Sequence, residues 1–503
     1  MKFVTVAAAT LVLALSACAG ARPEIQTAAT FDRIKDSPPR LRAFLAAMPK
    51  GADLHVHLSG QVYAESNLAA GLKAGHCLDT AAMRIVAPPC DAQPGGGRPS
   101  LSAVMADQAL VNRAIDTHSM RNFVPAPGVN GHGHFFATFP RFGEARDAGI
   151  MLAEVLNRAG RQQVRHMELM VTFGAKSIAA LAAAVPWSGD ADTQLAQLEA
   201  QDVAAMAHAA RAEVDHVLAI ARTQMACDGP APQPGCAVSV RFLQQVNRTA
   251  PPQVAAAQVV FGFRLAAADR RVAGINIVAP EDHVVALRDY DLHMRLIGAM
   301  AERLPQVGVA LHAGELALGL VPPEDLRDHI RKAVLVAGAR RIGHGVGVMY
   351  EDDPYGLLHL LAERRVAVEI NLTSNDVILG VRGAAHPFGV YRQEGVPTTL
   401  STDDEGVSRI DLTHEYQRAV QEHGLDYAEL KALSRRGLEY AFLPGASLWA
   451  DDRAWVMVEQ CRNGRDQRCD AFLAASEKAR LQWKLEQDFH RFEAGDTPAA
   501  RKG

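Results

Sequence analysis

Eight short runs of aliphatic and β-branched residues recur along the chain, with amphipathic stretches of helical length between them. The runs cover residues 52–58, 164–173, 237–246, 272–278, 307–313, 341–346, 366–372 and 397–403. Helices are expected at residues 101–118, 143–160, 192–222, 252–270, 284–304, 323–338, 355–364, 383–394 and 411–442. Strands that alternate with helices form parallel sheets, and eight such units close into a barrel. The sequence therefore predicts an α/β protein with a (β/α)₈ TIM-barrel fold.

The barrel carries two further segments. Residues of about 59–140, an insertion after the first strand, are far more than one connection needs. We expect this insertion to lie on the catalytic side of the barrel and to shape a substrate pocket. Residues of about 445–503 are expected to form a helical C-terminal extension, so that the barrel domain spans residues 38–503.

The first residues have the pattern of an export signal: a basic residue, a short apolar run over residues 3–15, then small residues. The run is too short to remain as a membrane-spanning helix. Leu15-Ser16-Ala17-Cys18 resembles a bacterial lipobox, which predicts a signal peptide at 1–17 and acylation of Cys18. Ordinary cleavage after Ala19 or Ala21 is the alternative.

Residues 19–37 are then expected to be a polar, irregular tether between lipid and barrel. The residue after the cysteine is Ala19 rather than aspartate, which favours the bacterial outer membrane in Gram-negative sorting. We therefore expect a lipoprotein that faces the periplasm and touches the membrane only through its anchor, or a secreted protein if the cysteine is not acylated.

The other six cysteines fall into three close pairs, each flanking a polar or Pro/Gly-rich loop. The pairs are Cys77 with Cys90, Cys227 with Cys236, and Cys461 with Cys469. Outside the cytoplasm, three local disulfides are the simplest interpretation. Metal binding is disfavoured because the spacing is not C-x-x-C and no histidines lie beside the cysteines.

Charge excludes nucleic acid as the expected partner. The net charge is -4, with 52 basic and 56 acidic residues scattered along the chain without basic runs. A small-molecule substrate is therefore expected. The oligomeric state is not determined by the sequence.

Polar residues stand at the C-terminal ends of four predicted strands, which in a barrel meet on the functional face. They are His55 and His57, His312 and Glu315, His344, and Asp403 and Asp404. Each group alone has a structural explanation: an incidental H-x-H, a turn histidine between glycines, a helix cap. Together they favour a site, because unrelated causes would not place all of them on one rim.

Three imidazoles and one carboxylate, those of His55, His57, His312 and Asp403, suit a single Zn²⁺ ion and leave room for a water. Zinc lowers the pKa of a bound water toward neutrality. His344 could orient or deprotonate that water, and Glu315 could carry a proton to the substrate. A second metal is disfavoured, because neither middle strand that could supply a bridging carboxylated lysine contains a lysine.

The order and spacing of these motifs resemble the adenosine deaminase family of the metal-dependent amidohydrolase superfamily. The matching motifs are Pro49-Lys50 with His55-Val56-His57, His312-Ala313-Gly314-Glu315, Arg341-Ile342-Gly343-His344-Gly345, Asn371-Leu372-Thr373-Ser374-Asn375 and Ser401-Thr402-Asp403-Asp404. The resemblance spans residues of about 50–420. Residues 120–123 and 134–139 further resemble the secreted adenosine deaminase growth factor branch.

The resemblance implies a zinc enzyme that converts adenosine or 2'-deoxyadenosine to inosine or 2'-deoxyinosine and ammonia in purine salvage. Glu315 would protonate purine N1, His344 and Asp403 would steer the attack of the zinc-activated water on C6, and Asp404 would hold N7. These roles agree with those inferred from the residues themselves.

Two departures from the family pattern leave the substrate open. Ser59 stands where many members have an aspartate that meets the ribose, and Ala279 replaces a glycine that offers its backbone N–H to purine N3. A deaminase of another 6-amino or N6-substituted purine is one alternative, and a nucleoside-binding lipoprotein without turnover is another.

Two further assignments have two interpretations each. Phe135, Phe136 and Phe139 could line the nucleoside pocket or form the core of the insertion. Glu168, on the second strand, could line the pocket or support its residues from behind, or it could be a structural rim group.

Overall fold

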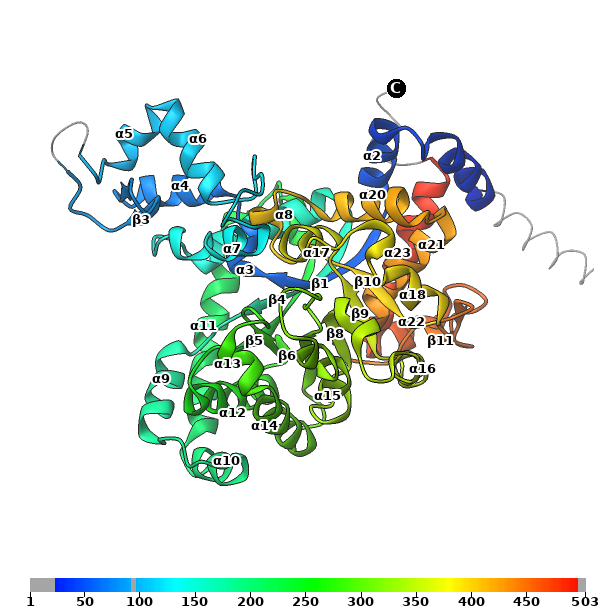
Figure 1. Cartoon of the computed structure of the whole chain (residues 1–503). Helices are drawn as coiled ribbons and strands as arrows, with labels where there is room; N and C mark the ends of the chain where they lie inside the picture. The colour runs from blue at the N-terminus through cyan, green and yellow to red at the C-terminus, as the bar shows by residue number, and fades with distance from the viewer. Residues whose placement is uncertain (1–22, 92–95, 496–503) are drawn as a thin grey trace, which may run out of the picture.

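In a computed structural model of the chain, which describes residues 23–91 and 96–495, eight parallel strands form one sheet in the order β1-β4-β5-β6-β7-β8-β9-β10 (Figure 1). The strands are β1 (Lys50–His57), β4 (Val164–Val171), β5 (Ser239–Asn247), β6 (Val272–Val278), β7 (Gly308–Ala313), β8 (Arg341–His344), β9 (Ala367–Ile370) and β10 (Thr398–Leu400). A parallel bridge between Val56 and Asp403 joins the first strand to the end of the last. The predicted (β/α)₈ barrel is thereby confirmed.

Helices follow the strands as connections around the barrel (Figure 1). They are α8 (Ala148–Arg161), α9 (Ala175–Ala184), α10 (Ala191–Glu199), α11 (Val203–Gln224), α12 (Pro252–Ala268), α13 (Val284–Arg288), α14 (Tyr290–Arg303), α15 (His329–Leu335), α16 (Pro354–Arg364), α17 (Leu372–Leu379), α18 (Phe388–Gln393), α19 (Glu405–Ser408), α20 (Leu412–His423) and α21 (Tyr427–Tyr440). Three of them, α9, α17 and α19, were not among the expected helices.

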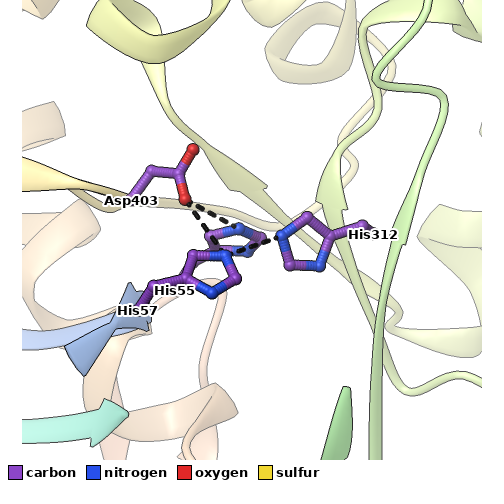
Figure 2. Close-up of side chains that lie close together, drawn as sticks. All are labelled: His55, His57, His312 and Asp403. Atoms are coloured by element: carbon purple, nitrogen blue, oxygen red, sulfur yellow. Dashed lines mark hydrogen bonds and ion pairs between the residues drawn. The ribbon is translucent and has the colours of Figure 1, made fainter. Parts of the chain in front are cut away.

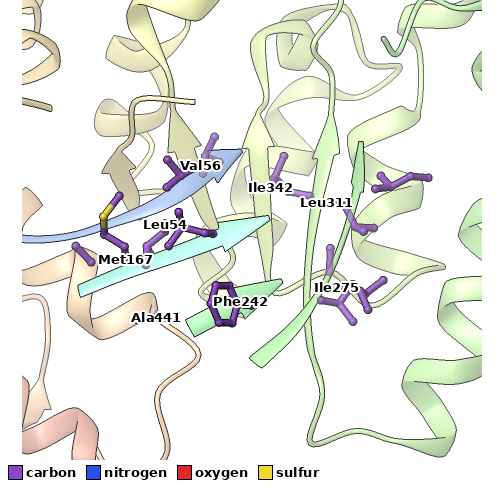
Figure 3. Close-up of a cluster of buried hydrophobic side chains, with 14 of the residues drawn as sticks. Leu54, Val56, Met167, Phe242, Ile275, Leu311, Ile342 and Ala441 are labelled. Atoms are coloured by element: carbon purple, nitrogen blue, oxygen red, sulfur yellow. The ribbon is translucent and has the colours of Figure 1, made fainter. Parts of the chain in front are cut away.

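Both faces of the strands are buried, which is why their sequences are nearly continuous apolar runs. In β1, Leu54 and Val56 join the large hydrophobic cluster shared with the helices, together with Leu311 of β7 and Ile342 of β8 (Figure 3). The alternate residues face the barrel interior, because successive side chains of a strand point to opposite sides. This alternation directs the histidines of β1 inward.

The insertion between β1 and α8 is folded. It contains α3 (Leu58–Gln61), α4 (Ala64–Lys73), β2 (Cys77–Asp79), β3 (Arg84–Val86), α5 (Leu101–Met105), α6 (Gln108–Thr117), α7 (Gly131–Phe136) and the 3₁₀ turn η1 (Phe139–Arg141). The part from α4 to α6 projects away from the barrel and has its own small hydrophobic core (Figure 1). By contrast, α7 packs against α17 of the barrel.

The C-terminal extension packs back on the barrel. It comprises the short strands β11 (Trp449–Asp451) and β12 (Val456–Met457) and the helices α22 (Gln467–Ala475) and α23 (Glu477–Glu493). The long helix α23 contacts α21 and β1, so the extension supports the side of the barrel where the sheet closes. The predicted helix near the C-terminus is therefore confirmed.

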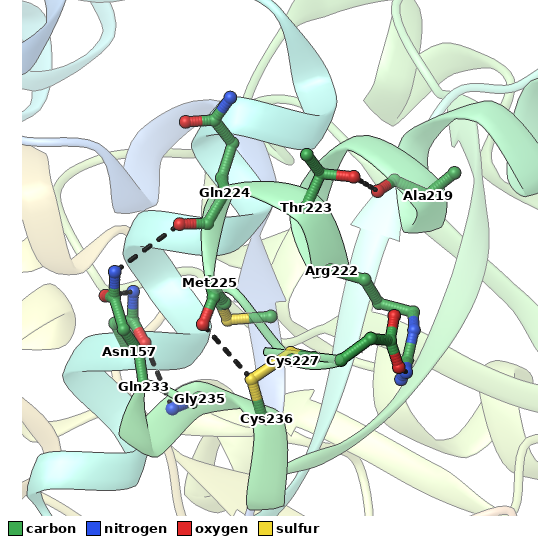
Figure 4. The surroundings of a disulfide bond; sticks show 11 residues. Asn157, Ala219, Arg222, Thr223, Gln224, Met225, Cys227, Gln233, Gly235 and Cys236 are labelled. Carbon is green, nitrogen blue, oxygen red and sulfur yellow. Dashed lines mark hydrogen bonds and ion pairs between the residues drawn. A yellow bond between two sulfur atoms is a disulfide. The ribbon is translucent and has the colours of Figure 1, made fainter. Parts of the chain in front are cut away.

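The three predicted disulfides are confirmed, each joining the two cysteines of one close pair. The bond between Cys227 and Cys236 links the end of α11 to the start of β5 (Figure 4). Beside it, the Asn157 side chain donates to Gln233 Oε1 and accepts from the backbone N–H of Gly235, which ties the same loop to α8.

The expected irregular tether is wrong for its described part. Residues 23–34 are helical, and α2 (Pro38–Ala47) follows. Phe31 is fully buried and packs against Phe44 and Tyr427, so this segment belongs to the folded domain. The predicted signal peptide and Cys18 lie outside the described residues. Among residues 23–91 and 96–495, no helix is long and apolar enough to cross a membrane.

Candidate functional site

Closure of the barrel brings four predicted metal ligands together. The backbone N–H of His57 donates to Asp403 O, and the backbone N–H of Asp403 donates to His55 O. These two hydrogen bonds join the first strand to the segment after the last strand and form the seam of the barrel. His312 reaches the same place from the end of β7 (Figure 2). One ligand atom from each of the four residues lies within 4.8 Å of the others.

The interatomic distances suit a metal cation. His57 Nε2 lies 3.2 Å from His312 Nε2 and 3.4 Å from Asp403 Oδ1, and His55 Nε2 lies 3.6 Å from the same carboxylate oxygen (Figure 2). Within the part of the chain that the structure describes, His55 Nε2 and Asp403 Oδ1 are buried without a hydrogen-bond partner. Buried polar atoms are normally satisfied, so this convergence of lone pairs is what a cation site would present.

Burial keeps two of the imidazoles in the neutral form that binds metals. It lowers the pKa of His57 to about 4 and the pKa of His312 well below its ordinary value. Three imidazole nitrogens and a carboxylate oxygen are ligands that Zn²⁺ accepts. The residues present therefore fit a zinc ion.

Contacts to the other ring nitrogen orient two of these imidazoles. His55 Nδ1 donates to Glu369 Oε2 at 2.7 Å, and His312 Nδ1 donates to Asn276 Oδ1 at 2.8 Å. In both rings the Nε2 lone pair is thereby left free for the metal. Gly343 is required beside His55, because a Cβ at this position would lie 2.4 Å from the imidazole.

A buried row of charges lies beneath the site. Arg341 donates to Glu369 at 2.5 Å and to Glu168 at 2.6 Å, and all three side chains are almost completely buried. The second carboxylate oxygen of Glu168 accepts from the backbone N–H of Phe442 at 2.5 Å. Glu168 is therefore a structural group that supports the site through Arg341, and sequence reasoning had missed Glu369 altogether.

Glu315 and His344 lie beside the four candidate metal ligands, which are called the metal set below. His344 Nε2 is 3.7 Å from Glu315 Oε1 and 3.9 Å from Asp403 Oδ2. Burial, with a smaller effect from Asp403, raises the pKa of Glu315 well above its ordinary value, which suits a carboxyl group that must hold a proton.

The turn that carries Glu315 is held by a residue that sequence reasoning did not identify. Glu281 is fully buried and accepts from the backbone N–H groups of Gly314 and Glu315, at 3.2 and 2.8 Å. It is also paired with His329 at 2.7 Å and lies 3.5 Å from Arg248. The sequence offered one indication of Glu281, namely an acidic residue shortly after the predicted strand at 272–278.

A cavity of about 390 Å³ opens onto these groups. Ser59, Ala279 and Asp404, the three predicted substrate contacts, all line it. Phe135, Phe136, Phe139 and Ile378 form an apolar wall of the same cavity, and these aromatic residues also pack on one another. The phenylalanines therefore line the cavity and also form part of the core of the insertion.

Two of the predicted substrate contacts have particular local geometry. Ala279 has φ +81°, so the backbone keeps the left-handed conformation that glycine would adopt there. Asp404 occupies the N-cap position of α19 but makes no side-chain cap hydrogen bond, and burial raises its pKa well above the ordinary value. Its carboxyl group is therefore available to the cavity rather than to the helix.

Part of the chain matches known adenosine deaminases in sequence. A family model described as adenosine deaminase matches residues 144–448. The adenosine deaminase of Shewanella loihica is 35% identical over 174 residues, which are 33% of this chain and 49% of that protein. That of Escherichia coli strain SE11 is 37% identical over 136 residues, 27% of this chain and 38% of that protein. The match thus spans half or less of these relatives' length.

Solved structures share the fold. An adenine deaminase from Arthrobacter aurescens aligns with a TM-score of 0.54 at 17% identity, covering 87% of this chain and 98% of that one. The Arabidopsis protein ADAL, solved with IMP, aligns with a TM-score of 0.52 at 17% identity, covering 88% and 97%. Since the family model covers more than half of the chain, the chain belongs to the adenosine deaminase family.

Proposed function

We propose that this protein deaminates adenosine or 2'-deoxyadenosine by hydrolysis, with one zinc ion, and serves purine salvage. One observation carries the proposal: the ligand atoms of His55, His57, His312 and Asp403 converge within 4.8 Å beside Glu315, on the wall of a cavity of about 390 Å³. A cavity of this size falls in the range of small-molecule sites.

A zinc ion bound there would supply Lewis acidity that makes a water nucleophilic near neutral pH. Burial raises the pKa of Glu315, which favours the protonated carboxyl group, so Glu315 can donate a proton to purine N1 and make C6 electrophilic. The water oxygen bonds to C6 and gives up its two protons, one to the amino nitrogen and one to replace the proton that Glu315 gave to N1. The bond from C6 to the amino nitrogen then breaks, and ammonia leaves. Burial also raises the pKa of Asp404, which favours a protonated carboxyl group that can donate a hydrogen bond to N7.

The lining of the cavity favours a nucleoside over a nucleotide. No lysine or arginine lies among the described residues that line it, whereas Glu315, Asp403 and Asp404 do. A phosphate group would find no cationic side chain to pair with there, which is unfavourable in a buried site. The phenylalanine wall offers a flat apolar surface to a purine ring.

A second candidate is a deaminase of another 6-amino or N6-substituted purine. Ser59 has a shorter side chain than the aspartate expected there, and the wall of Phe135, Phe136, Phe139 and Ile378 offers apolar surface to a substituent. A nucleoside-binding role without turnover is less well supported, because a binder has no need of a proton donor such as Glu315 beside a metal site.

The test is the ultraviolet change on conversion of adenosine to inosine by the purified protein, with and without a chelator. We expect conversion that the chelator abolishes and that added zinc restores. A panel of 2'-deoxyadenosine, adenine, AMP and N6-methyladenosine ranks the candidates by kcat/KM. Protein with bound zinc that converts none of them would contradict the proposal.

We further propose that the protein acts outside the cytoplasm, anchored through Cys18. Three disulfides support this, since such bonds persist mainly in oxidising compartments. Metabolic labelling with a fatty acid, compared between the wild type and Cys18→Ala, tests the anchor. Labelling that is equal in both, or absent from both, would contradict it.

A further inference from the structure

A row of three buried hydrogen bonds runs from α18 to His344. The backbone N–H of Phe388 lies 3.1 Å from His386 Nδ1, and His386 Nε2 lies 3.0 Å from Asn375 Oδ1. Asn375 Nδ2 lies 2.9 Å from His344 Nδ1. His386 is 3% exposed, and the other three residues are fully buried, so water does not compete for these bonds.

The backbone N–H of Phe388 sets the donor and the acceptor of each hydrogen bond in this row. A backbone N–H can only donate, so His386 Nδ1 accepts. Burial lowers the pKa of His386 to about 3, so the ring is neutral and its one proton is on Nε2. That N–H donates to Asn375 Oδ1, which fixes the amide so that its NH₂ group faces His344.

The amide in turn determines which nitrogen of His344 carries the proton. An NH₂ group can only donate, so His344 Nδ1 must accept, and Asn371 Nδ2 at 3.3 Å is placed to donate to the same atom. The proton of the neutral ring is therefore on Nε2. This nitrogen faces Glu315 and Asp403 and has no hydrogen-bond partner among the described residues.

We propose that His386 and Asn375 are positioning residues that hold His344 in the Nε2–H tautomer, so that His344 donates a hydrogen bond to the oxygen attacking C6 instead of removing its proton. A base would need a lone pair at Nε2, which this tautomer lacks. The proton of the attacking water is left to the carboxylate of Asp403. The reaction in this inference rests on the proposed function, whereas the tautomer does not.

Asn375→Asp is the most direct test. It keeps the shape of the side chain but replaces the NH₂ group that donates to His344 Nδ1 with an oxygen that can only accept. A carboxylate at residue 375 still accepts from His386, but it needs a donor at His344 Nδ1, so the proton moves there. We expect kcat with adenosine to fall about 100-fold or more, the usual effect of losing one well-placed donor. KM is expected to stay within about twofold and the zinc content to stay unchanged.

His386 is tested by a pair of variants. His386→Leu frees the Asn375 amide to rotate, and we expect kcat to fall about tenfold. His386→Gln can accept from Phe388 N–H and donate to Asn375, so it should restore most of kcat. His423→Leu is the matched control: its ring packs against those of His386 and Phe388, with centroids 5.9 and 5.0 Å away, but lies outside the row of bonds. Its kcat should be that of the wild type.

¹⁵N NMR of the zinc-loaded enzyme with labelled histidines measures the tautomer of His344 directly. The His344 signals are assigned by their absence from the spectrum of His344→Gln. We expect an unprotonated Nδ1 in the wild type and a protonated one in Asn375→Asp. A wild-type ring protonated on Nδ1 overturns the inference, as does an equal loss of kcat in His386→Gln and His386→Leu. The NMR needs no substrate, so an inactive wild type with the expected tautomer would overturn the proposed function while supporting the tautomer.

Discussion

Two residues of the site, His344 and Asp403, have backbone φ values of +69° and +57°. Non-glycine residues rarely adopt this left-handed conformation, and each such position costs on the order of 1–3 kcal/mol. His344 is the last residue of β8, and Asp403 lies three residues beyond the end of β10. Backbone hydrogen bonds fix the chain at both positions. The strained backbone turns each side chain toward the metal set, and the surrounding barrel compensates for the strain.

The variant Glu315→Gln tests the proposed proton donor. We expect it to keep the metal but to lose about three or more orders of magnitude in kcat, because purine N1 loses its proton source. Steady-state kinetics and metal analysis measure both. Glu351→Gln is the matched control: Glu351 is a carboxyl group whose pKa burial raises to about 8, and it accepts from the backbone N–H of Ile330 away from the cavity. Near-normal turnover in Glu315→Gln would disprove the proposed proton donor.

Ala279→Gly tests the left-handed backbone at the cavity. Glycine adopts φ +81° without the steric cost that a Cβ carries, so we expect the free energy of unfolding to rise by about 1 kcal/mol. The backbone donor is unchanged, so KM for adenosine should stay within about twofold. Urea unfolding and initial rates check the two expectations. A variant less stable than the wild type would show that Ala279 is not strained.

At the scale of elements, all eight barrel strands were predictable because buried parallel strands are continuous apolar runs. The missed helix α9 is largely alanine and isoleucine or leucine, so it shows little amphipathic contrast. The strand predicted to end at Leu372 stops at Ile370, because α17 begins where Asn371 leaves the sheet. The helix at residues 23–34 was missed because its docking depends on one aromatic residue, Phe31.

The buried row that joins β4, β8 and β9 predicts sensitivity to acid. Burial alone would raise the pKa of Glu168, but Arg341 outweighs it and lowers the pKa to about 2, and the pKa of Glu369 is lowered in the same way. A lowered pKa stabilises the fold above the ordinary value of 4.5 and loses that contribution as the pH falls toward about 2. For Glu168 this is about 3 kcal/mol.

Glu168→Gln should remove that part of the pH dependence. Urea unfolding of the chelated protein at about pH 5 and about pH 3 measures it, and the wild type should lose more stability between the two than the variant does. Chelation keeps metal release out of the comparison. Equal losses in the two proteins would show that Arg341 does not hold Glu168 ionised.

For the molecule as a whole, the metal ligands and Glu315 could be predicted because they lie at strand ends, and strand ends of a barrel share one face. The residues that orient them could not, because their contacts depend on the register of the sheet. Glu369 on β9 meets His55 on β1, far away in sequence, and Asn276 and Glu281 reach the end of the neighbouring strand β7 and the turn after it. A sequence pattern shows which face a residue takes but not which strand lies opposite. Only the register of the closed sheet shows that Glu369 meets His55.

The metal should therefore matter for the stability of the whole barrel. Its expected ligands come from β1, from β7 and from Asp403 beyond β10, so a bound ion ties the first strand to the last across the closure. A ligand at 1,000 times its dissociation constant adds about 4 kcal/mol to the free energy of unfolding. Hydrogen exchange with and without chelator should show the largest loss of protection at the backbone N–H groups of His57 and Asp403, which form the seam. The strands β5 and β6, which supply none of these ligands, are the internal control, and an equal loss of protection there would mean that the metal does not act through the closure.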